Sequence, residues 1–169
     1  MALEADKGEL RAGKPEPFLR TQSIETYPAF SPDGHWLAYA SNQSGTFEVY
    51  VRAFPDNGAQ VQISSGGGRI PRWSRRGGDL FYSTDDQRIM VAAYRVNGGS
   101  FQADSPRLWS QRRLGDTGVL PNFDVAPDGR RVAALLPVAS PAEQQAQNHV
   151  TFLMNFFEEV RRRFSAAGK

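Results

Sequence analysis

The stretch Phe30-Ser-Pro-Asp-Gly-His-Trp-Leu-Ala-Tyr-Ala-Ser41 (FSPDGHWLAYAS) reads as a tight turn that leads into an alternating strand. In the turn, Ser31 can bond its own backbone, Pro32 presets φ and Gly34 tolerates the reversal, which is the residue pattern of a type I turn. The residues that follow alternate with the period of a β-strand and not with that of a helix. The stretch therefore predicts a β-hairpin.

The same pattern occurs three times along the chain. The copies are residues 27–41 (YPAFSPDGHWLAYAS), 70–84 (IPRWSRRGGDLFYST) and 123–136 (FDVAPDGRRVAALL). In this alignment Phe30, Trp73 and Val125 correspond, and we expect all of them to be buried. The offsets of 43 and 52 residues lie in the range where self-similarity indicates a β-propeller or a solenoid. Each copy is one supersecondary unit.

Further strands are expected after each hairpin. Third strands are predicted at residues 47–51, 88–94 and 149–154, and fourth strands at 59–64 and around 107–109, after hairpin signals at 56–58 and 97–99. The predicted fold class is all-β, with blades of four-stranded antiparallel sheets. Three such blades are predicted, and one short C-terminal helix follows them.

The predicted boundaries follow from these units. They are a flexible N-terminal segment at 1–13, an extra outer strand at 14–21, blade 1 at 22–64, blade 2 at 65–110, blade 3 at 111–155, and a helix and tail at 156–169. The propeller portion thus covers residues 14–155. The prolines of the segment at 14–21 suit an edge strand, because proline donates no hydrogen bond to a ladder.

The composition excludes several classes of protein. Lys and Arg number 20 against 18 Asp and Glu, a net charge of +2, so the chain has no basic tract that implies nucleic acid. The absence of cysteine excludes disulfides and thiolate metal sites. No apolar run is long enough for membrane insertion. We expect a soluble chain whose compartment, cytoplasmic or extracytoplasmic such as periplasmic, depends on its parent protein.

Catalytic and metal-binding motifs are weak. His35 and His149 are the only histidines, and no G-x-S-x-G elbow is present, so we expect no enzyme activity and no catalytic residue. Asp85 and Asp86 are too few for a calcium loop and are expected in a polar turn, so neither a metal nor a cofactor is predicted. The basic and aromatic run at 69–76 is better explained by a core Trp73 and a solvated turn than by nucleic-acid binding.

A binding surface is expected on the loops that enter the first strands and join the second to the third. In a propeller these loops gather on one face around the channel and carry mixed charges, as at protein or peptide contacts. The candidate residues on this loop face are Tyr27, Asn42, Arg69, Arg72, Asp85 and Asn122.

The first copy with its third strand, YPAFSPDGHWLAYASNQSGTFEVYV, resembles the TolB-type, WD40-like repeat of bacterial β-propellers. The last copy is similar to the final blade of propeller regions linked to bacterial Ser/Thr kinases or transcriptional regulators. The resemblance implies a non-enzymatic module that binds a protein, a peptide or another ligand, or acts as a sensor. The alternative is the propeller portion of a larger serine hydrolase or peptidase whose catalytic domain lies outside this chain.

The resemblance implies a ring of six blades, so the three predicted blades make half of a six-bladed ring and cannot close an ordinary ring by themselves. Either the chain is the C-terminal half of a longer parent, or two copies assemble. We predict a two-fold homodimer in which Pro17–Thr21 of each copy completes the last blade of the other, because pairing removes two exposed ladder edges.

Overall fold

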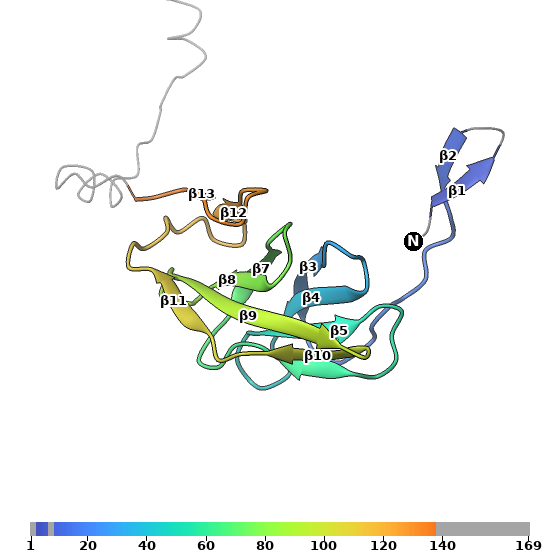
Figure 1. Ribbon diagram of the computed structural model, residues 1–169, viewed down its shortest axis with the longest axis horizontal. Coiled ribbons are helices and arrows are strands. Elements are labelled where there is room, and N and C mark those ends of the chain that lie inside the picture. Colours follow the sequence, from blue (N-terminus) through green and yellow to red (C-terminus); the bar gives the residue numbers. More distant parts are fainter. Residues whose placement is uncertain (1–2, 7–8, 138–169) are drawn as a thin grey trace, which may run out of the picture. The chain divides into compact units, whose positions relative to one another are not determined.

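The first repeat folds into a four-stranded antiparallel sheet, blade 1, in a computed structural model that describes residues 3–6 and 9–137 (Figure 1). Its strands are β3 (Glu25–Phe30), β4 (Trp36–Ser41), β5 (Glu48–Ala53) and β6 (Gln60–Gln62), hydrogen-bonded in that order. Each strand pairs with the next along the chain, which is the meander expected of a propeller blade. The fold class predicted from the sequence is confirmed in the described residues.

The second repeat forms blade 2, whose fourth strand is split in two. Its strands are β7 (Arg69–Trp73), β8 (Asp79–Ser83), β9 (Ile89–Asn97), β10 (Ser100–Ala103) and β11 (Arg107–Ser110). The long strand β9 pairs with β8 on one side and with both β10 and β11 on the other. The sequence predicted the pairing strand around residue 107 and missed β10, which directly follows the Gly98-Gly99 turn.

The third repeat contributes a hairpin of β12 (Phe123–Val125) and β13 (Val132–Ala134). The predicted third strand at 149–154 and the predicted helix at 156–169 lie outside the described residues. Another hairpin, β1 (Leu3–Asp6) with β2 (Glu9–Ala12), occupies the segment that was expected to be flexible.

Residues 13–24 are irregular, so the outer strand expected at 14–21 is not formed. Pro15 and Pro17 donate no ladder hydrogen bonds, and β6 and β10 are the strands that close the sheet edges of blades 1 and 2.

The three repeated turns are built alike. The amides of Gly34, Gly77 and Gly129 donate to the carbonyls three residues earlier, at 2.9, 3.0 and 2.9 Å. Gly34 has φ of 74°, a left-handed conformation that a side chain disfavours. The type I turn predicted at 31–34 is therefore present, and the middle copy keeps it although Arg75-Arg76 replaces Pro-Asp.

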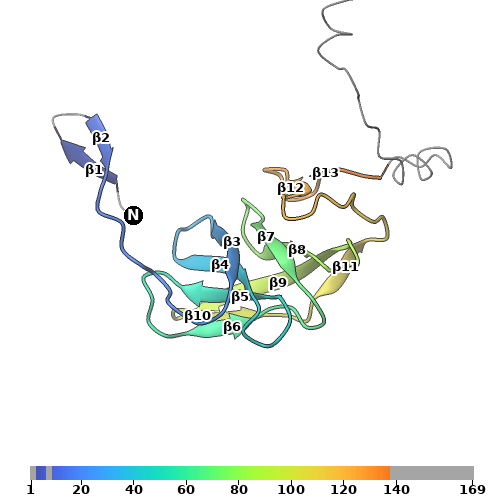
Figure 2. The same ribbon diagram turned by 180° about the vertical axis from the view of Figure 1, so that it is seen from behind.

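Blades 1 and 2 lie side by side, as both views show (Figure 2), and share a core of apolar side chains from both sheets. A second core joins blade 2 to the hairpin of the third repeat and includes Phe81, Phe123 and Val125. Blade 2 therefore packs one sheet face against blade 1 and the other against the hairpin of the third repeat.

The three aligned core positions have the same register but not the same burial. Phe30 pairs with Leu37, Trp73 with Leu80, and Val125 with Val132. Trp73 and Val125 are 8% and 7% exposed, whereas Phe30 is 54% exposed. The prediction that Phe30 is buried is wrong, because this position packs against a preceding blade and blade 1 has none in the described part of the chain.

Candidate functional site

Four of the six candidate loop-face residues surround one small cavity of about 100 Å³. They are Tyr27, Arg69, Asp85 and Asn122, which come from the entry of β3, the start of β7, the β8–β9 turn and the segment before β12. Gln87 and Val119 complete much of the wall. We call this cavity the loop-face cavity.

Its wall contains all the described non-glycine residues that have positive φ. These are Tyr27 at 54°, Ile70 at 52° and Gln87 at 65°. Tyr27 and Ile70 occupy the same repeat position, where the register of the first strand pair shifts in both blades. Left-handed backbone is disfavoured for side chains, above all for a β-branched one such as isoleucine. Residues held in this way cluster at binding sites, where the surrounding structure maintains them.

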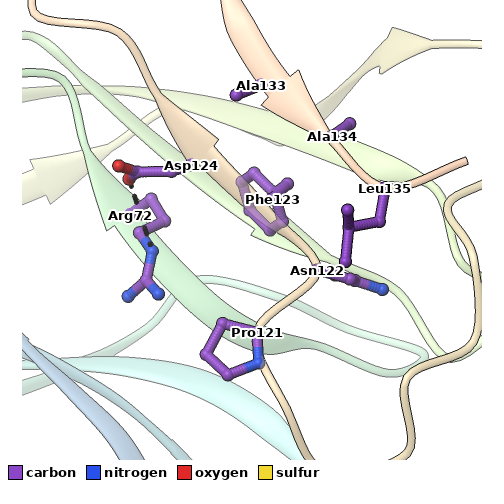
Figure 3. A pocket seen from close by; sticks show the side chains of 8 residues that line it. All are labelled: Arg72, Pro121, Asn122, Phe123, Asp124, Ala133, Ala134 and Leu135. Atoms are coloured by element: carbon purple, nitrogen blue, oxygen red, sulfur yellow. Dashed lines mark ion pairs between the residues drawn. The ribbon is translucent and has the colours of Figure 1, made fainter. Parts of the chain in front are cut away.

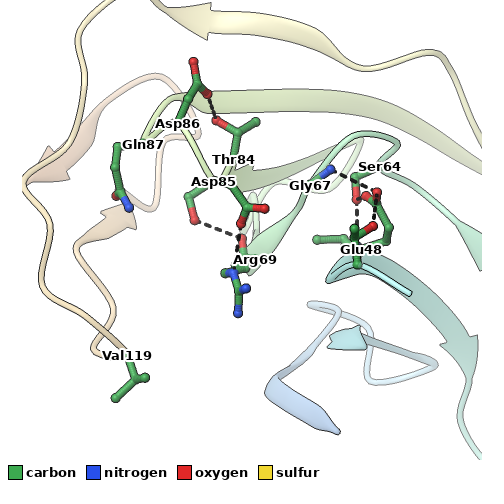
Figure 4. Close-up of polar contacts among 12 residues, drawn as sticks. Glu48, Ser64, Gly67, Arg69, Thr84, Asp85, Asp86, Gln87 and Val119 are labelled. Atoms are coloured by element: carbon green, nitrogen blue, oxygen red, sulfur yellow. Dashed lines mark hydrogen bonds and ion pairs between the residues drawn. The ribbon is translucent and has the colours of Figure 1, made fainter. Parts of the chain in front are cut away.

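Arg69 and Asp85 form an ion pair at the mouth of the cavity, with 3.0 Å between Arg69 Nε and Asp85 Oδ1 (Figure 4). The Arg69 guanidinium also lies 3.9 Å from the centre of the Phe47 ring. Both charged side chains are more than a third exposed, so the pair adds little stability. An exposed ion pair of this kind can break, so that the Arg69 guanidinium binds a partner group in place of Asp85.

Asn122 is a buried polar residue of the cavity wall. Its Nδ2 donates to Gln87 Oε1 at 2.9 Å and to the Gly115 carbonyl at 3.0 Å, which fixes the orientation of the amide. Its Oδ1 is buried and has no hydrogen-bond partner among the described residues. A buried acceptor without a donor costs about 1–3 kcal/mol. The cavity wall therefore contains a buried acceptor that no described residue satisfies.

The segment before β12 forms the remaining wall. The Tyr27 hydroxyl donates to the Val119 carbonyl at 2.7 Å and so ties this segment to blade 1. The side chains of Val119 and Leu120 are 79% and 64% exposed beside it. An apolar rim thus adjoins the polar cavity.

The other two candidates lie elsewhere. Arg72 lines a second cavity of about 590 Å³ together with Phe123 and Asp124, and its Nε is 3.7 Å from Asp124 Oδ1 (Figure 3). Asn42 accepts a hydrogen bond from the Ile24 amide at 2.8 Å, which holds the chain at the entry to blade 1. The structure does not bring these two residues into the loop-face cavity.

Glu48 is a buried carboxylate that sequence reasoning missed. It accepts hydrogen bonds from the amides of Gly66 and Gly67 at 2.8 and 2.9 Å, and from the hydroxyl of Ser64 (Figure 4). These contacts hold the link between blades 1 and 2. Burial, followed by the Glu48 charge, raises the pKa of Tyr82 to about 12. The sequence feature that could have identified Glu48 is an acidic residue at the start of an apolar strand, with a glycine run further along the chain at 66–68.

The alternative sites considered from the sequence are paired or exposed in the structure. Asp86 pairs with Arg88, and a hydrogen bond from Thr84 lowers the pKa of its carboxyl. The described residues contain no group of three or more His, Cys, Asp or Glu side chains that could hold a metal ion. His35 is exposed beside the first turn, and His149 lies outside the described residues.

The basic run at 69–76 divides as the sequence predicted. Trp73 is buried in the core between blades 1 and 2, whereas Arg75 and Arg76 are exposed in the turn. Within residues 3–6 and 9–137, no helix is long and apolar enough to cross a membrane.

A sequence match to one curated protein agrees with the repeat pattern. No family model matches the sequence. The Tol-Pal system protein TolB of Desulfosudis oleivorans is 36% identical over 59 residues, which is 35% of this chain and 14% of that protein. The structure of putative TolB from Agrobacterium tumefaciens aligns with a TM-score of 0.39 at 18% identity, over 54% of this chain and 36% of that one. This chain thus spans only part of either relative. The sequence match and the repeated four-stranded blades support, over that part, a resemblance to the TolB-type β-propeller family.

Proposed function

We propose that this chain is a non-enzymatic binding or sensor module that takes a protein or peptide partner at the loop-face cavity. One observation carries the proposal, namely the concentration of strained backbone around a cavity that holds a buried, unpaired acceptor. Both features cost free energy in the unbound fold, and a bound partner can recover part of it.

The chemistry of the cavity suits a polypeptide. A backbone N–H or a side-chain amide of the partner would donate to Asn122 Oδ1. A carbonyl or carboxylate would accept from the Arg69 guanidinium, because only the Nε of Arg69 is engaged by Asp85. The exposed Val119 and Leu120 would give the apolar contact at the rim.

A random-peptide display against the immobilised full-length chain tests the proposal, with calorimetry on the enriched peptides. Arg69→Ala should weaken their binding about tenfold or more, as for loss of a charged hydrogen bond. The matched control is Arg95→Ala, which breaks a comparable ion pair with Asp104, 2.7 Å long and away from the cavity. If no peptide is enriched, or if the two variants weaken binding equally, the proposed site is wrong.

We also propose that the chain forms the two-fold homodimer predicted from the sequence, in which Pro17–Thr21 completes the last blade of the partner copy. The irregular backbone of residues 13–24 supports this role, because the segment is not committed to a sheet within its own chain. A full-length chain that stays monomeric at micromolar concentration would refute it.

A further inference from the structure

The sheet face of blade 1 that turns away from blade 2 repeats the surface that blade 2 buries. In blade 2, the Trp73 and Tyr94 rings meet edge to face, with centroids 5.0 Å apart and an interplanar angle of 83°. In blade 1, Phe30 and Phe54 meet with centroids 4.9 Å apart and the same angle. The strand register makes the two aromatic pairs equivalent. Trp36 pairs with Ala53, the residue before Phe54, and its repeat equivalent Asp79 pairs with Ala93, the residue before Tyr94. We call this surface, Phe30 with Leu37 and Phe54, the blade 1 free face.

The difference between the two pairs is burial. Trp73 lies in the core between the blades and donates from its Nε1 to the Ala29 carbonyl at 2.9 Å. Phe30 and Phe54 are 54% and 38% exposed, although Phe18 contacts Phe54 at 5.3 Å between ring centroids. Among residues 3–6 and 9–137, the blade 1 free face is thus half of a blade interface without its other half. Large exposed apolar side chains that adjoin one another mark interaction surfaces.

The complementary half is exposed at the other end of the array. The repeat offsets make Ala38, Phe81 and Ala133 equivalent. Ala38 belongs to the core with Trp73, and Phe81 belongs to the core with Val125, so this position always faces the next blade. Ala133 in β13 is exposed, as is Leu135, which is 58% exposed (Figure 3). We call Ala133 with Leu135 the blade 3 free face.

We propose that the blade 1 free face docks on the blade 3 free face of a second copy of this chain. The contact continues the packing that already joins blades 1 and 2, with Phe30 in the place of Trp73 and Ala133 in the place of Ala38. This inference rests on the proposed homodimer and gives it a contact surface that does not depend on strand exchange. Two copies joined in this way at both ends form a closed ring, whereas a single contact leaves one face of each kind open.

Light scattering on the full-length chain and three variants tests the contact. The wild-type chain should have twice the mass of a single chain at about 100 µM, a concentration at which even a weak interface is occupied. Phe30→Ser removes one face and Ala133→Arg blocks the other, so each should weaken association at least tenfold. Val96→Ser, at an apolar residue that is 41% exposed and lies on neither face, is the matched control and should not change the mass.

A mixture of the two face variants distinguishes the proposed contact between the blade 1 and blade 3 free faces from other contacts that could hold a dimer. A Phe30→Ser chain keeps its blade 3 free face, and an Ala133→Arg chain keeps its blade 1 free face, so an equimolar mixture should form mixed dimers through the one intact contact. Near-ultraviolet circular dichroism confirms that each variant is folded. A folded Phe30→Ser or Ala133→Arg chain that dimerises like the wild type would overturn the inference, as would a wild-type chain that is monomeric.

A separate variant identifies failure of the strand-exchange proposal. Leu19→Pro removes one amide hydrogen from the exchanging segment and replaces no residue of either free face. If Leu19→Pro abolishes the dimer while Phe30→Ser does not, strand exchange stands and the face contact falls. If only Phe30→Ser and Ala133→Arg abolish it, the face contact stands without strand exchange.

Discussion

Substitution of Trp73 and Phe30 by alanine compares one repeat position in two environments. Trp73 is buried, packs edge to face with Tyr94 and donates a 2.9 Å hydrogen bond to the Ala29 carbonyl. Loss of a buried tryptophan side chain costs about 3–5 kcal/mol. The loss of its indole donor brings Trp73→Ala to the upper part of that range.

Phe30→Ala should cost much less, although Phe30 has the same register and an equivalent aromatic partner. Phe30 is 54% exposed, so only about half of its transfer free energy is lost, or about 1 kcal/mol. The edge-to-face contact with Phe54 adds about 0.5–1.5 kcal/mol. The expected difference between the two variants is therefore about 2–3 kcal/mol.

Urea unfolding, followed by the fluorescence of the remaining tryptophans, measures both losses. The chain concentration is kept low enough for the protein to be monomeric, so that association does not stabilise Phe30. Trp73→Phe is an informative control, because it keeps an apolar ring while it removes the indole donor and part of the ring volume, and it should fall between the wild type and Trp73→Ala. Equal losses for Trp73→Ala and Phe30→Ala would refute the assignment of preceding-blade contacts to this position.

Two further predictions concern buried polar groups. Glu48→Gln should lower the free energy of unfolding by about 2 kcal/mol, because an amide is a weaker acceptor for the Gly66 and Gly67 amides, whereas Glu25→Gln on the partly exposed β3 should have a smaller effect in the same urea assay. Tyr82, with its pKa raised to about 12, should stay protonated in the folded chain up to that pH, while an unfolded tyrosine ionises near pH 10. The contribution of Tyr82 to stability is then complete below about pH 10 and is lost between about pH 10 and 12. Tyr82→Phe should remove this loss from the pH dependence of the free energy of unfolding. An unchanged pH dependence in the variant would contradict the assignment.

The local features of the fold could be predicted from the sequence. Turn chemistry and strand alternation depend on residues next to one another, so the repeats identified the three hairpins and the correspondence of Phe30, Trp73 and Val125. The order of strands within a blade followed from the short connections between them. Propeller topology places equivalent loops together, and four of the six predicted loop residues line one cavity.

The tertiary structure decided which of the predicted residues meet and which are buried. Tyr27, Arg69, Asp85 and Asn122 are brought together by backbone bulges with positive φ, which no residue pattern at those positions indicates. The amides bound by Glu48 come from a loop 18 and 19 residues later, a pairing that sequence alternation cannot encode.

The same distinction explains the errors. Phe30 has the sequence environment of a core residue, but its burial depends on a neighbouring blade. Trp73 packs against blade 1, whereas no preceding blade covers Phe30 among the described residues. Residues 14–21 have a strand-like composition and form no strand, since a strand needs a ladder as well as a sequence. The sequence determined each blade, because its turns and alternation are local. Only the tertiary structure determined which blade faces are covered, because burial requires a neighbour.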